Sequence, residues 1–164
     1  MLGDRPYPTM DDIPRLPLLW GAIREVLRLY PVAMGIFRQT GARLEFDGER
    51  IESGTQVVIL PYALHRHPSY WDRPESFDPE RWTRAPRPSP AFAYMPFLTG
   101  PRKCMGQPLA ELELLVVLST LVRNFDVHVQ RARAPLTPFL VPRFASDLPF
   151  TVRRVDQSAN QPAA

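Results

Sequence analysis

The only cysteine of the 164-residue chain lies in the segment Phe97-Leu-Thr-Gly100-Pro-Arg102-Lys-Cys104-Met-Gly106. Apolar residues then recur at intervals of about 3.6, as is typical of a helix, at Leu109, Leu112, Leu115, Val116 and Leu121. Pro108 suits the first helical turn. Cys104 therefore lies in a glycine-marked loop before a helix N-terminus, where free N–H groups and the helix dipole stabilise a thiolate.

A thiolate is a good ligand for iron, because it is soft and negatively charged. The stretch resembles the cysteine loop of the cytochrome P-450 haem-thiolate monooxygenases, and it matches at Phe97, Gly100, Arg102, Cys104 and Gly106. Taken alone, a single cysteine is also typical of a buried thiol. With five matched positions, the resemblance implies that these residues bind haem b and that Cys104 is the ligand of its iron.

A second resemblance lies upstream, in the helix expected from Pro17 to Leu29. Glu25 and Arg28 are neighbours on one helical face, and taken alone they indicate a surface ion pair worth a few tenths of a kcal/mol. The segment is similar to the Glu-x-x-Arg helix of the family. Residues 74–82 resemble its meander, with Trp82 where phenylalanine is most usual. The resemblance implies a buried cluster of Glu25, Arg28 and Arg81 that holds the cysteine loop in place and has no chemical role.

The expected fold class is α+β, as the C-terminal portion of the mainly helical family fold. Between the Glu-x-x-Arg helix and the meander we expect a small β-sheet, from extended segments at 33–40, 43–46, 51 and 56–60 and a tight turn at Asp47-Gly48. After the cysteine loop we expect a long helix over about 107–123 and a strand over 125–129. A terminal β-hairpin is expected to pair residues 139–144 with 150–155.

The sheet also carries candidate site residues. Arg38 matches a family arginine that meets a haem propionate, although a solvated strand arginine is the simpler interpretation. Ala33, Met34 and Ile36 match a segment on the substrate side of the haem, and ordinary core packing explains these residues equally well. The resemblance therefore implies a small apolar organic substrate.

Composition bounds the remaining possibilities. Twenty prolines make up about 12% of the chain against a usual share of about 5%, which predicts much irregular coil. One cysteine excludes an internal disulfide and fits a reducing compartment. No signal peptide or membrane span is recognisable, so we expect a cytoplasmic protein, with a membrane anchor in a missing N-terminal part as the alternative. The net charge of +3, without a basic stripe interleaved with aromatics, argues against nucleic-acid binding. His65, His67 and His128 lack further metal ligands nearby, so we expect loop or core histidines.

The resemblance covers residues 16–155, which match only the C-terminal third to half of the family. The chain is thus expected to be a single partial domain over 1–164, with a disordered tail at 157–164. The family's central helix, with its acid–alcohol pair beside the oxygen site, has no counterpart here. Two functions stay open. One is a monooxygenase that inserts one atom of O2 into an organic substrate, and the other is a truncated, catalytically silent haem-binding fragment. A redox-sensing thiol is disfavoured by the match at both motifs.

An electron donor is also implied. Arg73, Arg84, Arg87 and Lys103 fall in segments that face the proximal side of the haem in the family. We expect them to attract an acidic ferredoxin or flavin reductase. The alternative is that they only keep an exposed loop soluble.

Overall fold

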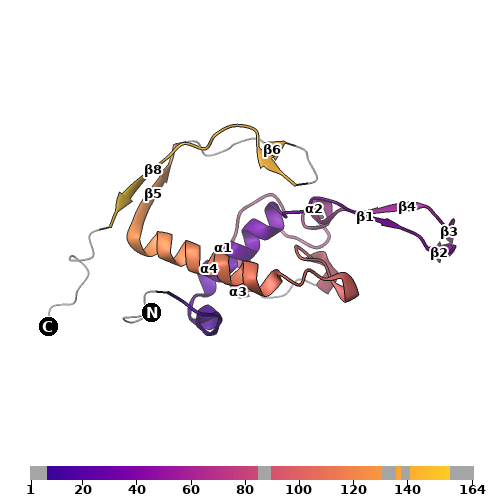
Figure 1. Ribbon diagram of the computed structural model, residues 1–164, viewed down its shortest axis with the longest axis horizontal. Helices are drawn as coiled ribbons and strands as arrows, with labels where there is room; N and C mark the ends of the chain where they lie inside the picture. The colour runs from indigo at the N-terminus through magenta and orange to yellow at the C-terminus, as the bar shows by residue number, and fades with distance from the viewer. Residues whose placement is uncertain (1–6, 85–89, 131–135, 138–140, 156–164) are drawn as a thin grey trace.

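A computed structural model describes residues 7–84, 90–130, 136–137 and 141–155. Its two long helices, α1 (Pro17–Leu29) and α4 (Gln107–Asn124), lie at the centre of the molecule (Figure 1). The short helical segments are η1 (Met10–Arg15), α2 (Pro61–Leu64), α3 (Arg81–Arg84), η2 (Ala91–Ala93) and η3 (Gly100–Arg102). The strands are β1 (Ile36–Gln39), β2 (Leu44–Phe46), β3 (Glu49–Ile51), β4 (Gln56–Ile59), β5 (Phe125–Val129), β6 (Leu136–Thr137), β7 (Arg143–Phe144) and β8 (Phe150–Arg154).

The core is small and lies where α1 meets α4. Ile23 and Leu27 of α1 and Leu115 of α4 are buried together, and Phe97 of the cysteine loop packs against them. Leu18, at the start of α1, lies outside this core and is 57% exposed. The contact thus places the cysteine loop directly beside the Glu-x-x-Arg helix.

Gly21 lets α1 approach the meander, residues 74–82, closely. A Cβ atom built at Gly21 would meet the backbone carbonyl of Pro79 well inside contact distance. Because glycine lacks this atom, the backbones of the helix and the meander can touch. Gly21 therefore contributes to the docking of the segment that carries Arg81.

The first sheets form an arm that extends from the helices (Figure 1). β1 pairs with β4, and β2 pairs with β3, both antiparallel. Asp47 and Gly48 join β2 to β3 with φ angles of 51° and 79°. Positive φ at both central residues defines a type I′ turn, so the expected hairpin at Asp47-Gly48 is confirmed.

The expected terminal pairing of 139–144 with 150–155 is wrong. β8 instead pairs with β5 over five residues, whereas β7 pairs with β6. The longer register is favoured because Val127 lies opposite Val152, and Asp126 forms a cross-strand ion pair with Arg153 at 2.8 Å. The expected tail at 157–164 lies outside the described residues.

α4 begins at Gln107, as expected, but apolar residues face solvent around much of it. Leu109 is 69% exposed and Val122 is 72% exposed, whereas Leu115 is fully buried. A helix that is apolar on several sides is typical of the interior of a larger protein. Within the described residues no helix is both long and apolar enough to span a bilayer.

Candidate haem-thiolate site

The cysteine loop is held by its own backbone. The Cys104 N–H donates to the Phe97 carbonyl at 2.8 Å, and the Lys103 N–H donates to the Gly100 carbonyl at 3.1 Å. Gly100 has φ of 72°, in the left-handed region that favours glycine. Two hydrogen bonds and one left-handed glycine thus fix the path of the backbone from Phe97 to Cys104.

The Cys104 thiol is exposed and lies just before α4. Gly106 is the N-cap of this 18-residue helix, and a Cβ atom added there would lie 3.8 Å from the Cys104 sulfur. The first N–H groups of a helix have no intrahelical acceptor and carry partial positive charge. An accessible, soft sulfur at this position is a donor that suits haem iron, and the residues present therefore fit the cofactor.

The other predicted cofactor and substrate residues lie on separate elements. Arg102, on η3, is exposed, and so is Arg38, on β1. Among the described residues neither guanidinium forms an ion pair; that of Arg38 donates only to the Phe37 carbonyl, at 2.9 Å. Both remain available for an anionic group. The predicted substrate-side residues, Ala33, Met34 and Ile36, are half-buried at the base of the sheet arm.

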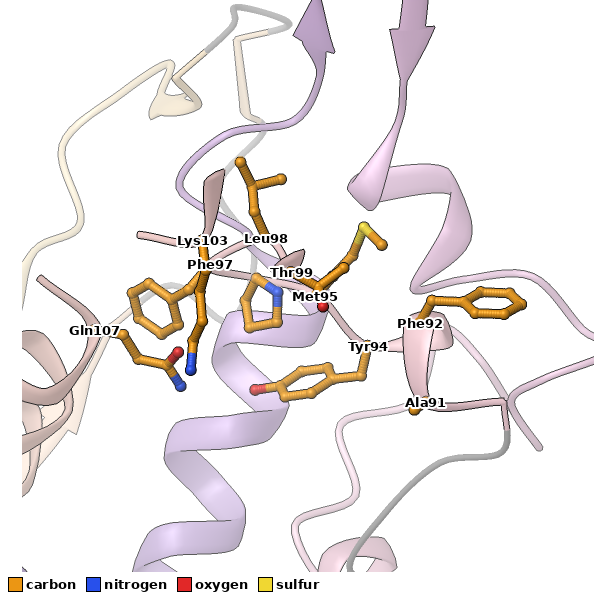
Figure 2. Close-up of a pocket in the computed structure, with 10 residues that line it drawn as sticks. Ala91, Phe92, Tyr94, Met95, Phe97, Leu98, Thr99, Lys103 and Gln107 are labelled. Atoms are coloured by element: carbon orange, nitrogen blue, oxygen red, sulfur yellow. The ribbon is translucent and has the colours of Figure 1, made fainter. Parts of the chain in front are cut away.

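A pocket of about 420 Å³ lies beside the cysteine loop. Figure 2 shows Phe97, Lys103 and Gln107 on one side of it and Phe92 on the other. Its wall is fixed by Tyr94, whose O–H donates to the Arg24 carbonyl at 3.2 Å, and burial raises the pKa of this phenol. Gln107 is held by its own hydrogen bond to Glu111 at 2.7 Å.

Glu25 is the centre of a buried cluster that contains the three residues predicted from sequence. Its carboxylate accepts Arg28 Nε at 3.0 Å and Nη2 at 2.8 Å, a bidentate pair, and Arg81 Nε at 3.0 Å. The Asp78 N–H adds a bond at 3.1 Å. Burial alone would raise the pKa of Glu25, but hydrogen bonds from Arg28 and Asp78, with the charges of Arg28 and Arg81, hold the pKa below its usual value.

Arg28 uses every N–H of its guanidinium in this cluster. Besides Glu25, it donates to the carbonyls of His65 at 2.8 Å, Pro74 at 2.6 Å and Ser76 at 3.1 Å. Arg81 similarly donates to the carbonyls of Asp72 and Arg73. These planar donors fix the backbone leading into and through the meander, which a lysine ammonium cannot do in the same way.

Sequence reasoning missed two residues of this region. Trp82 was expected only to fill an aromatic slot, yet its indole N–H donates to Glu25 Oε2 at 3.0 Å. His65 was expected to be a loop or core histidine, and its full burial fits the core alternative, but its hydrogen bonds to Arg28 and Met95 were not foreseen. The tryptophan in place of phenylalanine was a usable signal, because an indole brings a donor. Nothing in the spacing of the histidines singled out His65.

The expected set of free basic residues needs a correction. Arg73 pairs with Asp72 and Asp78, and Arg84 pairs with Asp78 and Glu80. Lys103 is exposed and forms no ion pair within the described part of the chain. Arg87 lies outside the described residues. Two of the expected charges are thus partly neutralised by their neighbours.

The family described as Cytochrome P-450 matches residues 1–146. Human cytochrome P-450 4V2 is 41% identical over 136 residues, which are 82% of this chain and 26% of that protein. The human mitochondrial 25-hydroxyvitamin D-1 alpha hydroxylase is 38% identical over 156 residues, 92% of this chain and 30% of that protein. The solved structure of the cyanobacterial CYP120A1 with retinoic acid bound is similar with a TM-score of 0.81 and 30% identity, over 90% of this chain and 35% of that chain.

The chain belongs to the cytochrome P-450 family. The structural similarity to that cyanobacterial protein confirms the expected α+β portion of the family fold. The chain spans 26% and 30% of the lengths of the two human relatives. The cysteine loop and its supports therefore correspond to a limited part of those relatives.

Proposed function

We propose that this chain is the haem-ligating portion of a monooxygenase and that Cys104 is the axial ligand of haem b. The observation that carries the proposal is the exposed Cys104 thiol, in a loop fixed by hydrogen bonds directly before α4. When bound, haem with a thiolate ligand supplies the dioxygen activation that inserts one oxygen atom into an organic substrate. The chain's own residues hold that group through the Cys104 sulfur and the positive charges near it.

The proposed roles of the other residues follow from their placement. Arg38 and Arg102 carry exposed positive charges, which suits the two propionates of haem. Phe97 lies against the core and offers an apolar wall. Gly100 supplies the left-handed turn of the loop, and Gly106 leaves its backbone close to the Cys104 sulfur. The buried cluster of Glu25, Arg28 and Arg81 has an indirect, structural role in this proposal, because it fixes the backbone of the meander.

The proposed substrate is a small apolar organic molecule. Ala33, Met34 and Ile36 are apolar and half-buried, so they offer surface that water does not fully cover. One relative carries the name of a hydroxylase of 25-hydroxyvitamin D, and a solved neighbour holds retinoic acid. Both names point to lipophilic molecules, which supports the same class of substrate here.

The proposed electron donor is an acidic iron–sulfur or flavin protein. Its attraction rests on Lys103, one residue before Cys104, since Asp78 engages both Arg73 and Arg84. The lone cysteine fits a reducing compartment, and we extend the proposal to the cytoplasm on that basis.

A second candidate function is a haem-binding chain without turnover. The specific observation in its favour is the exposure of large apolar residues beside the site, with Met105 97% exposed and Leu109 69% exposed. Such surface is typical of a region that other parts of a protein normally cover. The two functions differ in whether oxygen reaches a substrate.

The test is to purify the protein from its gene with all in-frame upstream coding sequence and to supply dioxygen of a heavy isotope. A monooxygenase places one labelled atom in each hydroxylated product, with reduction supplied by a ferredoxin and its reductase. A set of lipophilic substrates, including retinoids and secosteroids, is the first choice. Haem binding without label in any product supports the silent fragment instead.

A further inference from the structure

His65 is a fully buried histidine with a partner for each ring nitrogen. Its Nε2 lies 2.9 Å from the Met95 backbone N–H, and its Nδ1 lies 3.2 Å from the Arg28 carbonyl. Because the Met95 N–H can only donate, Nε2 must be the acceptor, and the proton must be on Nδ1, which donates to Arg28. The network therefore assigns one neutral tautomer to His65.

The two bonds join segments that are distant in sequence. His65 caps the end of α2, Arg28 belongs to α1, and Met95 lies in the approach to the cysteine loop. The connection with α1 is reciprocal, since Arg28 Nη1 donates back to the His65 carbonyl at 2.8 Å. The imidazole thus bridges the buried Glu25 cluster and the chain leading to Cys104.

Met95 is connected to the Cys104 backbone by two hydrogen bonds of the cysteine loop. Its carbonyl accepts the Leu98 N–H at 3.1 Å, and two residues after it Phe97 accepts the Cys104 N–H at 2.8 Å. The Tyr94 ring also packs against the imidazole, with centroids 5.4 Å apart. A shift of Met95 therefore displaces the backbone that holds the Cys104 amide.

We propose that His65 is a positioning residue that fixes the cysteine loop through the Met95 N–H and thereby keeps Cys104 in place as the thiolate ligand. The proposal rests on the assignment of Cys104 as the haem ligand. His65 acts through the backbone, since its two ring nitrogens are engaged by the Arg28 carbonyl and the Met95 N–H. Two observations carry it: the complete burial of the ring and its two hydrogen bonds to different segments.

The charges around His65 provide a readout. Burial lowers the pKa of His65 to about 4 from an ordinary 6.5; its bond to Arg28 opposes this effect, while the nearby Arg28 and Arg66 add to it. Tyr94, neutral at these pH values, is the other titratable group packed against the ring. Because the pKa of His65 is lower in the folded state than in the unfolded state, its contribution to folding stability is fully present above pH 6.5. That contribution is lost as the pH falls toward about 4. Protonation puts a hydrogen on Nε2, which then opposes the Met95 N–H.

The experiment follows the Soret band of the reduced, carbon-monoxide-bound protein, loaded with haem, as pH is lowered. In the wild type we expect the thiolate-type band to convert to the neutral-ligand type between pH 6.5 and about 4. His65→Gln offers an acceptor that does not titrate, so its conversion should shift to lower pH by about one unit or more. His65→Phe keeps the ring shape without an acceptor and should lose most of the thiolate-type band even at neutral pH.

His67→Gln and His128→Gln are matched controls, because both residues are exposed histidines. Each should retain the wild-type band and the wild-type pH profile. A His65→Gln profile that coincides with the wild type, or a His65→Phe variant with an intact band, overturns the proposal.

Histidine ring ¹⁵N spectroscopy and exchange of the Met95 amide separate this proposal from the haem assignment. The His65 ring should show the Nδ1–H tautomer and stay neutral down to about pH 5, which lies between its lowered pKa and the ordinary pKa of a histidine. In His65→Phe, hydrogen exchange of the Met95 amide should accelerate. A His65 ring that titrates near its ordinary pKa of 6.5 overturns the proposal, whatever the haem spectrum. A wild type without any thiolate-type band, but with these ring signals, contradicts only the haem assignment.

Discussion

Glu25 and Trp82 lie 57 positions apart in the sequence, yet the indole N–H of one donates to a carboxylate oxygen of the other at 3.0 Å in a buried site. Each oxygen of Glu25 thereby receives at least two donors. A buried carboxylate is tolerated only when its lone pairs are satisfied in this way. Trp82 is thus a fourth member of the cluster, beyond its role as an aromatic filler.

Trp82→Phe should destabilise the protein by about 1.5–3 kcal/mol, because a hydrogen bond to a charged acceptor is lost while the ring shape is largely kept. Trp71→Phe is the matched control, since Trp71 and Trp82 are both 5% exposed and the Trp71 indole donates to a neutral carbonyl, that of Leu64. Its loss should be about 0.5–1.5 kcal/mol. If urea unfolding shows the same decrease in unfolding free energy for both variants, the special role of Trp82 is contradicted.

Gly21→Ala should lower the folding stability, whereas an ordinary glycine-to-alanine change inside a helix raises it. Such a change normally stabilises by about 0.5–1 kcal/mol, since alanine loses less backbone entropy on folding. Here the new Cβ meets the Pro79 carbonyl, so we expect a destabilisation of about 1–3 kcal/mol. Gly41→Ala, where the Cβ has open space, should change the melting temperature little. A Gly21→Ala variant that melts higher than the parent contradicts the close approach.

Glu25→Ala should cost about 3–5 kcal/mol and release haem, because Arg28 and Arg81 are left buried without their carboxylate. The lowered pKa of Glu25 implies stability that is present above its ordinary value of 4.5 and is lost as pH falls through the folded-state value. The variant should therefore lose part of that acid dependence. Glu80→Ala removes only an exposed pair with Arg84 and serves as control. Parental melting and haem content in Glu25→Ala would exclude the proposed lock.

Lys103→Glu should slow second-order reduction by an acidic ferredoxin and flatten its dependence on salt, since steering by exposed charge is screened by ions. Arg84→Glu should have the smaller effect, because Asp78 and Glu80 already offset that charge. Stopped-flow reduction over a salt series measures both. Identical rates and slopes for Lys103→Glu and the parent would leave Lys103 as ordinary surface charge.

Local patterns predicted the local elements well. The start of α4 at Gln107, the span of α1 and the Asp47-Gly48 turn depend on neighbouring residues, and each follows from propensity and turn chemistry. Glu25, Arg28 and Arg81 were brought together by the family resemblance, because their spacing alone indicates only a surface pair.

Contacts between distant segments could not be predicted from the sequence. β5 pairs with β8 over five residues, although the two strands are distant in the sequence. The prediction had paired β8 with residues 139–144, which are closer to it in the sequence. The hydrogen bond from Met95 to His65 spans 30 positions and depends on how α1, α2 and the cysteine loop pack together. Such bonds are set by tertiary packing, which no local period encodes.

Whether Cys104 is the iron ligand can be read from the carbon monoxide spectrum of the reduced, haem-loaded protein. The parent protein should give the red-shifted Soret band of a thiolate-ligated complex. Cys104→His, which offers a neutral nitrogen in place of the thiolate, should bind carbon monoxide without that band. A thiolate-type band that persists in Cys104→His would exclude Cys104 as the iron ligand.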